Sequence, residues 1–321
     1  MTGLDDKEGS RLEADARYLS DPALDGRSPG SRGHQLAGRH LERRLADLGV
    51  LPLFADGFRQ PILDGGCEVG SNVCGRMKGT SGKTVLIGAH YDHFAGIPGA
   101  DDNAAALAIA LDVARRLAPW EGESDVAFCF FDLEEPPRFL GPTMGSNYFV
   151  AHCPLDLEKL SCAIIMDLCG HDVPIPGAED VLFVTGAEFS PALVDVVRQA
   201  EGGRLPALMA RNEHIGDMSD HRAFRVNGLP FLFLSCGWWE HYHRPSDTFE
   251  KLNLAKMAHV AAFVADLVRR LDGMTVAVRP THARSFLAVE AETFRRLVGI
   301  DIPPVKSLLD AAARQIIRKL T

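Results

Sequence analysis

Short runs of apolar residues, separated by longer stretches with helical periodicity, constrain the fold of this 321-residue chain most strongly. The runs predict five buried strands: Thr84–Ala89, Asp125–Phe131, Ala163–Met166, Val181–Val184 and Leu229–Leu234. Each run is rich in Val, Ile, Leu or Phe at neighbouring positions, which is typical of strands that helices cover on both faces. Strands that alternate with helices along a chain predict an α/β fold.

Four helices are predicted around these strands, because apolar residues recur at helical spacing and helix-ending signals follow. They are Gln35–Leu48, Ala104–Leu117, Pro191–Gln199 and Leu254–Leu271. We predict one domain over residues 1–275 and a C-terminal helical extension over residues 276–321. Within the extension, Val305–Leu320 carries apolar residues along one helical face. This face predicts that the extension either docks on the domain or forms a contact between two copies of the chain.

The composition argues against several classes of protein. A formal charge of −9 disfavours a nucleic-acid or anionic-membrane partner, because either partner requires a basic face. The first residues contain no apolar stretch typical of a signal peptide, and no run approaches the ~20 apolar residues of a membrane span. The seven cysteines are scattered and lack paired metal-ligand spacing. We therefore expect a cytoplasmic protein with reduced thiols and without a nucleic-acid or membrane partner.

Side chains of the kind that bind zinc follow the predicted strands at the point where each strand ends. They are His90 and Asp92, Glu134 and Glu135, Asp167, and, beyond a short loop, His243. Imidazole and carboxylate groups are common ligands of zinc in proteins. In open α/β sheets, ligand sites gather beyond the carboxyl ends of the strands. The sequence therefore predicts a zinc site at this edge of the sheet.

A further carboxylate comes from the segment Gly99-Ala-Asp-Asp-Asn, which opens the predicted helix Ala104–Leu117. An isolated Asp at a helix start is more often an N-cap than a metal ligand. Because the strand ends supply other ligands, we interpret one of the pair Asp101 and Asp102 as a ligand as well.

Two pairs of residues indicate how such a site would be organised. Residues two apart on an extended segment point the same way, so Asp92 is expected to accept the second ring N–H of His90 and to fix its tautomer. The side chains of the adjacent Glu134 and Glu135 diverge. One of them can therefore bind metal while the other reaches the water that attacks the substrate.

The remaining histidines give weaker signals. Four lie on helical or polar stretches and are expected to be solvated: His34, His40, His259 and His282. Four others lie in loops near the predicted ligands, but their position alone assigns them no role: His93, His171, His214 and His241. His221, at a predicted helix start, is interpreted as a structural residue or as a partner of a ligand.

Six short motifs follow one another along the chain: Gly88-Ala-His-Tyr-Asp, Gly99-Ala-Asp-Asp-Asn-Ala, Phe131-Asp-Leu-Glu-Glu, Met166-Asp, Ser219-Asp-His-Arg-Ala-Phe and Tyr242-His-Arg-Pro-Ser-Asp-Thr. In this order they resemble the co-catalytic zinc aminopeptidases of metallopeptidase family twenty-eight, which also includes the glutaminyl cyclases. The resemblance covers roughly Leu24 to Leu271. No single motif is specific, but six in order are a strong signal.

The resemblance implies a mixed, mostly parallel central sheet between helix layers and a site for two zinc ions. One zinc would be bound by His90 and Asp167, and the other by Glu135 and His243. Asp102 would bridge the two ions.

The resemblance also implies roles for residues beside the metals. Glu134 would be the general base, and Tyr242 would help to stabilise the developing oxyanion. The peptide bond between Asp102 and Asn103 would be cis. Two positions depart from the family pattern: Ala105-Ala106 replaces Ser-Gly, and Pro136-Pro137 replaces Gly-Leu in the loop beside the metals, so the substrate preference of better-known members is not carried over.

The leading hypothesis is a two-zinc aminopeptidase that hydrolyses the N-terminal peptide bond of peptides through a water that bridges the metals. A glutaminyl cyclase-like acyltransferase is the first alternative, although the sequence from His243 to Thr248 is peptidase-like. A carboxypeptidase or N-acyl hydrolase would require a basic pocket residue such as Arg138 or Arg211. A binding protein on the same fold would be expected to lack part of the ligand set, which is complete here.

The expected partner is a peptide, and the sequence leaves open whether copies of the chain associate. Three aromatic residues indicate either an apolar substrate pocket or ordinary core: Phe139, Trp238 and Trp239.

Overall fold

The computed structural model describes residues 6–200, 205–279, 283–299 and 301–320. Within these ranges one mixed sheet has the strand order β1-β3-β5-β4-β6-β9-β7-β8, and β2 pairs with β3 beside it. The strands are β1 (Leu51–Pro52), β2 (Arg59–Asp64), β3 (Cys67–Met77), β4 (Thr84–His90), β5 (Asp125–Phe131), β6 (Leu160–Met166), β7 (Leu182–Thr185), β8 (Ala207–Met209) and β9 (Phe231–Ser235). The neighbours β5, β4, β6 and β9 run parallel and form the centre, whereas β3 and β7 run antiparallel to their central neighbours.

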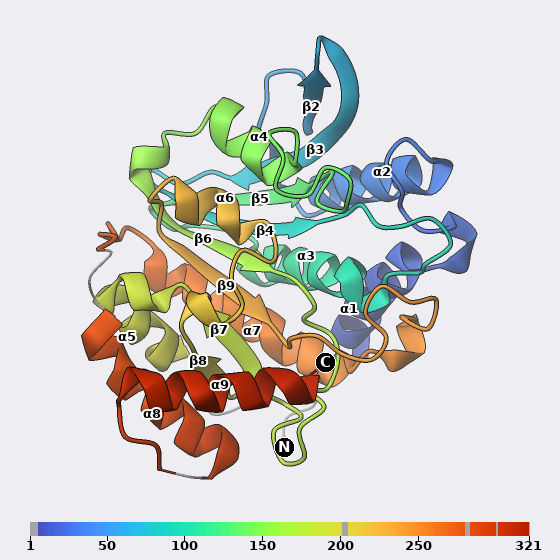
Figure 1. Ribbon diagram of the computed structural model, residues 1–321. Helices are drawn as coiled ribbons and strands as arrows, with labels where there is room; N and C mark the ends of the chain where they lie inside the picture. The colour runs from blue at the N-terminus through green and yellow to red at the C-terminus, as the bar shows by residue number, and fades with distance from the viewer. Residues whose placement is uncertain (1–5, 201–204, 280–282, 300, 321) are drawn as a thin grey trace.

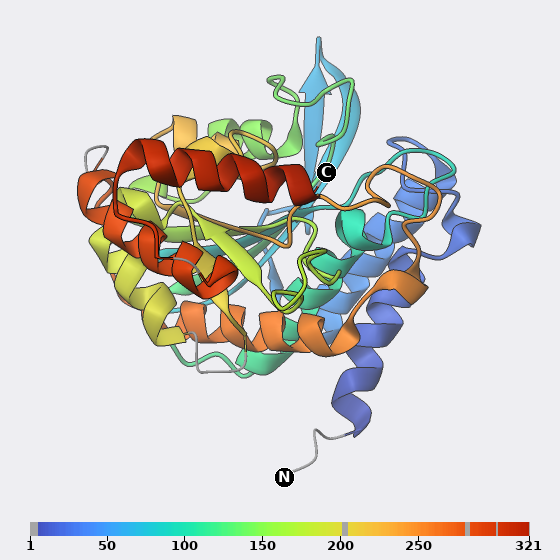
Figure 2. The ribbon, with the colours of Figure 1, turned by 60° about the horizontal axis from the view of Figure 1, so that its bottom comes forward.

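Helices cover both faces of this sheet, as Figures 1 and 2 show. They are α1 (Asp6–Leu19), α2 (Arg32–Asp47), α3 (Ala106–Leu117), α4 (Gly145–His152), α5 (Pro191–Ala200), α6 (His221–Val226), α7 (Leu254–Leu271), α8 (Ala283–Val298) and α9 (Lys306–Leu320). The larger apolar core includes residues of α1, α2, α3, α5 and α7, and the smaller one includes residues of α4 and α6. The expected α/β fold, with a mixed sheet between helix layers, is confirmed. No helix of the described ranges is long and apolar enough to cross a membrane.

The central strands β4 and β5 form where the sequence predicts them. All seven residues of β4 and all seven of β5 are buried, because helices cover both faces of these strands. Their parallel pairing, from Thr84 with Asp125 to His90 with Phe131, brings the two strands to the same edge of the sheet. The residues that follow these strands therefore lie close together.

Two predicted boundaries move for identifiable reasons. The strand predicted from Leu229 begins at Phe231, because the Leu229 N–H closes the end of α6 by donating to the Phe224 carbonyl. The helix predicted from Ala104 begins at Ala106, because Asp102 and Asn103 have non-helical backbone angles. The segment Ala100–Ala105 thus forms a separate turn that places Asp102 ahead of the helix.

Two histidines of α2 correct the expectation that they are solvated. His34 and His40 are each only 6% exposed. His34 Nε2 lies 2.8 Å from Asp132 Oδ1, and His40 Nε2 lies 2.8 Å from Asp15 Oδ1. Each ring is buried because a carboxylate from another part of the chain provides a hydrogen-bond partner, which the local sequence does not reveal. His259 is partly buried, and His282 lies outside the described residues.

The last two helices lie beside the β7–β8 end of the sheet, next to α5 (Figure 1). Phe286 and Phe294 of α8 and Leu309 of α9 belong to the larger apolar core, and Leu309 is fully buried. Leu308, by contrast, is 48% exposed. The buried face of α9 therefore runs through Leu309 and Ile316, and it contacts the rest of this chain.

Candidate metal centre

The predicted ligands come together at one edge of the central sheet. His90 is the last residue of β4, Asp167 directly follows β6, and Glu135 follows β5 after a short turn. His243 arrives from the loop after β9, and Asp102 from the turn before α3. Parallel strands end at the same edge, which explains why these distant residues meet.

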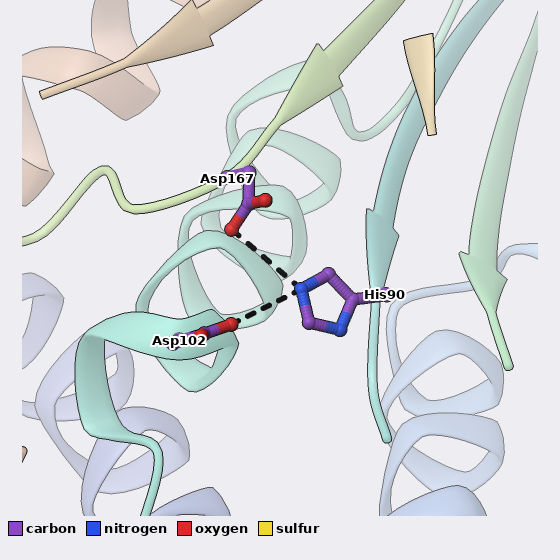
Figure 3. A group of neighbouring side chains, drawn as sticks. All are labelled: His90, Asp102 and Asp167. Atoms are coloured by element: carbon purple, nitrogen blue, oxygen red, sulfur yellow. Dashed lines mark ion pairs between the residues drawn. The ribbon is translucent and has the colours of Figure 1, made fainter. Parts of the chain in front are cut away.

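A first group contains His90, Asp102 and Asp167, and Figure 3 shows their side chains pointing toward one another. His90 Nε2 lies 3.2 Å from Asp102 Oδ1 and 3.6 Å from Asp167 Oδ1. The three residues are buried. Their ligand atoms are close enough to bind a single metal ion.

The chemistry of this group fits a cation. His90 Nε2 and Asp167 Oδ1, which lie 3.6 Å apart, are buried and have no hydrogen-bond partner among the described residues. His90 Nδ1 lies 3.2 Å from the carbonyl oxygen of Asp92, which can only accept, so a neutral ring presents Nε2 as an acceptor. Acceptors that face one another without a donor are costly in a buried site, and a metal cation removes that cost.

The same carboxylates act on the pKa of His90. Burial by itself lowers this pKa, but Glu134, Asp102 and Asp167 outweigh burial and raise it well above 6.5. A site that attracts a proton so strongly also attracts a metal cation.

A second group shares Asp102 with the first. His243 Nε2 lies 3.1 Å from Asp102 Oδ2 and 3.3 Å from Glu135 Oε1. Because Oδ1 of Asp102 faces His90 while Oδ2 faces His243, this carboxylate lies between the two groups. Burial alone raises the pKa of Asp102, but His93, His243 and His90 outweigh it and hold this pKa well below 3.8. The carboxylate is therefore ionised and available to two cations.

His93 is part of this second group, although the sequence gave it no role. Its Nδ1 lies 2.7 Å from Glu135 Oε1 and 3.9 Å from Asp102 Oδ2, and its Nε2 is buried without a partner. The three side chains His93, Asp102 and Glu135 are arranged closely enough to hold a metal ion. The sequence signal was its place three residues after His90 in the same strand-end segment.

Asp92 does not make the contact that the sequence predicts. Its Oδ1 is 3.7 Å from His90 Nδ1, beyond hydrogen-bond distance, and the backbone carbonyl of Asp92 approaches the ring instead. The carboxylate accepts the backbone N–H groups of Glu134 at 3.1 Å and Glu135 at 3.0 Å. Because both oxygens face these donors, Asp92 holds the loop that carries the two glutamates.

Two buried residues outside the predicted set fix the position of Asp102. The carboxylate of Asp247 accepts the backbone N–H groups of Asp101 at 2.9 Å and Asp102 at 3.1 Å. The fully buried Arg27 guanidinium donates to five backbone carbonyls, among them those of Gly99 and Asp102. The peptide bond between Asp102 and Asn103 is cis, as the resemblance implied. No local motif reveals Arg27, because its partners are distant in sequence.

Glu134 and Tyr242 lie beside the metal-binding groups. Glu134 Oε2 is 4.0 Å from His90 Nε2, and burial raises the pKa of Glu134 well above 4.5, with Asp167 adding to the effect and His90 opposing it. The Tyr242 ring stacks on His243 with centroids 3.8 Å apart. Burial and the neighbouring carboxylates raise the pKa of Tyr242, so its hydroxyl keeps its proton and can donate a hydrogen bond.

Comparisons with known proteins identify similar sequences and similar folds. Residues 72–268 match the profile of Peptidase family M28. The uncharacterized protein YfbL of Escherichia coli is 27% identical over 219 residues, which cover 58% of this chain and 67% of YfbL.

Two solved structures share the fold. A zinc aminopeptidase from Bacillus subtilis superposes with a TM-score of 0.65 and 16% identity, covering 84% of this chain and 95% of that one. A glutaminyl cyclase from Bacteroides thetaiotaomicron superposes with a TM-score of 0.63 and 18% identity, covering 81% of this chain and 97% of that one. At such low identity these likenesses concern the fold alone.

Proposed function

Because the chain belongs to peptidase family M28, we propose that it is a zinc-dependent aminopeptidase that removes N-terminal residues from peptides. The observation that carries the proposal is the pair of ligand groups that share Asp102. A carboxylate with one oxygen toward each group suits two neighbouring metal ions, as in co-catalytic hydrolases.

We assign the ligands as follows. His90 and Asp167 would hold one zinc ion, Glu135 and His243 would hold the other, and Asp102 would contact both. Zinc ions held there would supply Lewis acidity toward a carbonyl oxygen and would lower the pKa of a water molecule. The buried acceptors without donors around His90 support this assignment.

The residues beside the ligands would carry the proton transfers. We assign Glu134 as the general base that takes a proton from the attacking water and passes it to the leaving amine. Burial raises its pKa above 4.5, and a carboxylate of raised pKa is a stronger base than an exposed one. Asp92 keeps Glu134 in place through the loop backbone, and the Tyr242 hydroxyl is available to donate to the developing oxyanion.

The charged residues near the site bear on the alternative substrates. A carboxypeptidase or N-acyl hydrolase would need a free cation in the pocket. Arg211 contacts Glu290, Asp310 and Glu213, so carboxylates already neutralise its charge. Arg138 pairs with Asp64, which is exposed. These contacts favour a neutral substrate pocket over one for acidic groups.

The compartment and the assembly belong to the proposal as well. All seven cysteines are free thiols, which fits a reducing compartment such as the cytoplasm. We propose that residues 1–275 form the peptidase domain and that residues 276–321 extend it by packing on its surface. The buried Leu309 supports packing within one chain over a contact between copies.

The test is a screen of aminoacyl p-nitroanilides and of N-terminal glutaminyl peptides, with zinc and with a chelator. We expect zinc-dependent release of p-nitroaniline and no cyclisation of glutaminyl peptides. Cyclisation without amide hydrolysis would instead identify the chain as a glutaminyl cyclase.

A further inference from the structure

An apolar cavity of about 140 Å³ adjoins the candidate metal centre. Its wall includes Asp167, which is one of the assigned ligands, and Tyr242, which stacks on another. Phe183, Phe233 and other residues of the sheet form part of the remaining wall. A substrate whose carbonyl group lies at the metals can therefore reach this cavity with a neighbouring side chain.

The C-terminal helices complete the cavity. Phe294 and Leu297 of α8 and Ala313 and Ile316 of α9 line it. These residues lie beyond 72–268, the segment that matches the family profile. The helix pair α8–α9 is thus an addition to the matched segment, and it contributes to a cavity that the assigned ligands also line.

A buried ionic network fastens the helix pair to the segment after β8. Glu290 of α8 is fully buried and accepts both the backbone N–H of Arg211 at 3.0 Å and its Nε at 2.6 Å. Asp310 of α9 accepts from the same guanidinium at 2.7 Å, and His214 Nε2 lies 2.8 Å from Glu290. Because these charged groups bind one another, they hold the wall without offering a free charge to a ligand.

The size of the cavity indicates which ligand fits. An apolar space of roughly 150 Å³ accommodates a benzene ring. A benzyl or isobutyl side chain therefore fills this cavity, whereas a methyl group leaves most of it empty. Each methylene that an apolar pocket does not contact weakens recognition by about tenfold.

We propose that the helix pair α8–α9 is a specificity element that forms part of the pocket for a large apolar side chain on the N-terminal residue of the substrate. This inference rests on the proposed aminopeptidase function. Phe294, Leu297, Ala313 and Ile316 select the substrate by filling the space around its side chain. They take no part in bond cleavage.

The experiment compares kcat/KM on phenylalanyl, leucyl and alanyl p-nitroanilide for the zinc-loaded wild type and three variants. Ala313→Phe fills the cavity, and Leu297→Ala enlarges it. Leu308→Ala is the control, because it changes an exposed residue of α9, the helix that carries Ala313. We expect the wild type to prefer the phenylalanyl and leucyl substrates to the alanyl one by about tenfold or more. Ala313→Phe should remove this preference by lowering kcat/KM for the large substrates alone, and Leu308→Ala should keep it.

Leu297→Ala decides the question if Ala313→Phe does not fold. It should weaken the preference for leucyl over alanyl substrate, because the enlarged cavity no longer packs around an isobutyl group. Equal effects of the cavity variants on all three substrates, or a wild type that prefers the alanyl substrate, would overturn the inference while leaving the aminopeptidase function intact.

A binding measurement separates the inference from the function. If the wild type cleaves none of the substrates, the aminopeptidase proposal fails, and calorimetric titration with L-phenylalaninol and L-alaninol then tests the pocket. Tighter binding of L-phenylalaninol that Ala313→Phe or Leu297→Ala abolishes would support the pocket. Equal binding of the two amino alcohols, or of L-phenylalaninol to wild type and variants, would refute it.

Discussion

The carboxylate of Asp92 accepts the backbone N–H of Glu135 at 3.0 Å, and its other oxygen accepts that of Glu134 at 3.1 Å. One side chain at the end of β4 therefore positions the loop that follows β5. The two glutamates owe their places to a contact between strand ends, which makes Asp92 a positioning residue for both. The consequences for the metals and for catalysis are testable.

We expect Asp92→Asn to weaken zinc binding and turnover together. The amide offers one acceptor oxygen, and its NH2 group faces a backbone N–H, so one buried donor loses its partner at a cost of about 1–3 kcal/mol. Loss of such a supporting contact typically lowers metal affinity by ~10–100-fold. Zinc titration and kcat measure the two effects.

Asp64→Asn is the matched control for this substitution, because Asp64 is exposed and pairs with Arg138 of the loop that carries the glutamates. It should change neither zinc affinity nor kcat. If Asp92→Asn binds zinc as tightly as the wild type and turns over at the same rate, the positioning role is wrong.

Substitutions of the two adjacent glutamates should affect different properties, one the catalytic rate and the other the zinc content. Glu134→Gln keeps the size of the side chain and removes its basicity, so both metals should remain while kcat falls by about 10²–10⁴-fold. Glu135→Gln should lose metal, and high zinc should partly restore its activity. Elemental analysis and kcat on one substrate distinguish the two variants. If only Glu134→Gln loses zinc, then Glu134 is the ligand and Glu135 the base.

Substitutions of His243 and His93 should likewise give proteins with different zinc contents. His243 Nε2 is 3.1 Å from Asp102 Oδ2, whereas His93 Nδ1 is 3.9 Å from that oxygen and 2.7 Å from Glu135 Oε1. We therefore expect two zinc ions per wild-type chain and one in His243→Ala. His93→Ala should keep two ions and hold the one at Glu135 more weakly. Retention of both ions by His243→Ala, together with loss of one by His93→Ala, would make His93 the ligand.

The strand-end pattern explains why much of this site can be predicted from the sequence. A buried parallel strand such as β4 is a continuous apolar run, so its end and the polar residue after it are visible locally. Asp102 could be interpreted either as an N-cap or as a ligand, and its position depends on Arg27 and Asp247, which are far away in the chain. Contacts of that kind leave no periodic signal.

The parts that the sequence did not predict have identifiable physical causes. The β2–β3 hairpin alternates polar and apolar residues with glycines, so its strands lack the apolar run on which the strand prediction relied. His34 appeared solvated because its partner, Asp132, is 98 residues away. The cavity wall depends on how α8 and α9 pack, and an amphipathic pattern predicts a buried face without naming its partner.

The packing of α9 predicts a large difference between two adjacent leucines. Leu309 is fully buried, so Leu309→Ala should lower the free energy of unfolding by about 2–5 kcal/mol. Leu308 is 48% exposed, so Leu308→Ala should change it by less than about 0.5 kcal/mol. Denaturant titration measures both, and equal small effects would show that α9 does not pack on the domain in solution.

His221 gives a prediction about acid stability. Its ring is buried against Phe233, with centroids 4.1 Å apart, and its Nε2 lies 3.0 Å from the Gly216 carbonyl oxygen. Burial lowers the pKa of His221 from 6.5 to about 4. The folded state therefore binds the proton less tightly than the unfolded state. The resulting stability is fully present above pH 6.5 and is lost as the pH falls toward 4.

The effect should amount to about 2 kcal/mol between pH 8 and pH 5, since each pKa unit corresponds to about 1.4 kcal/mol. His221→Gln can still donate to Gly216, but it loses the ring that packs against Phe233, so it should be less stable than the wild type at pH 8. Because glutamine does not titrate, this variant should lose less stability on acidification. The exposed His152→Gln serves as the control and should follow the wild-type profile. Unfolding free energies at pH 8, 6 and 5 provide the comparison. Parallel pH profiles for the wild type and His221→Gln would mean that another buried group causes the acid sensitivity.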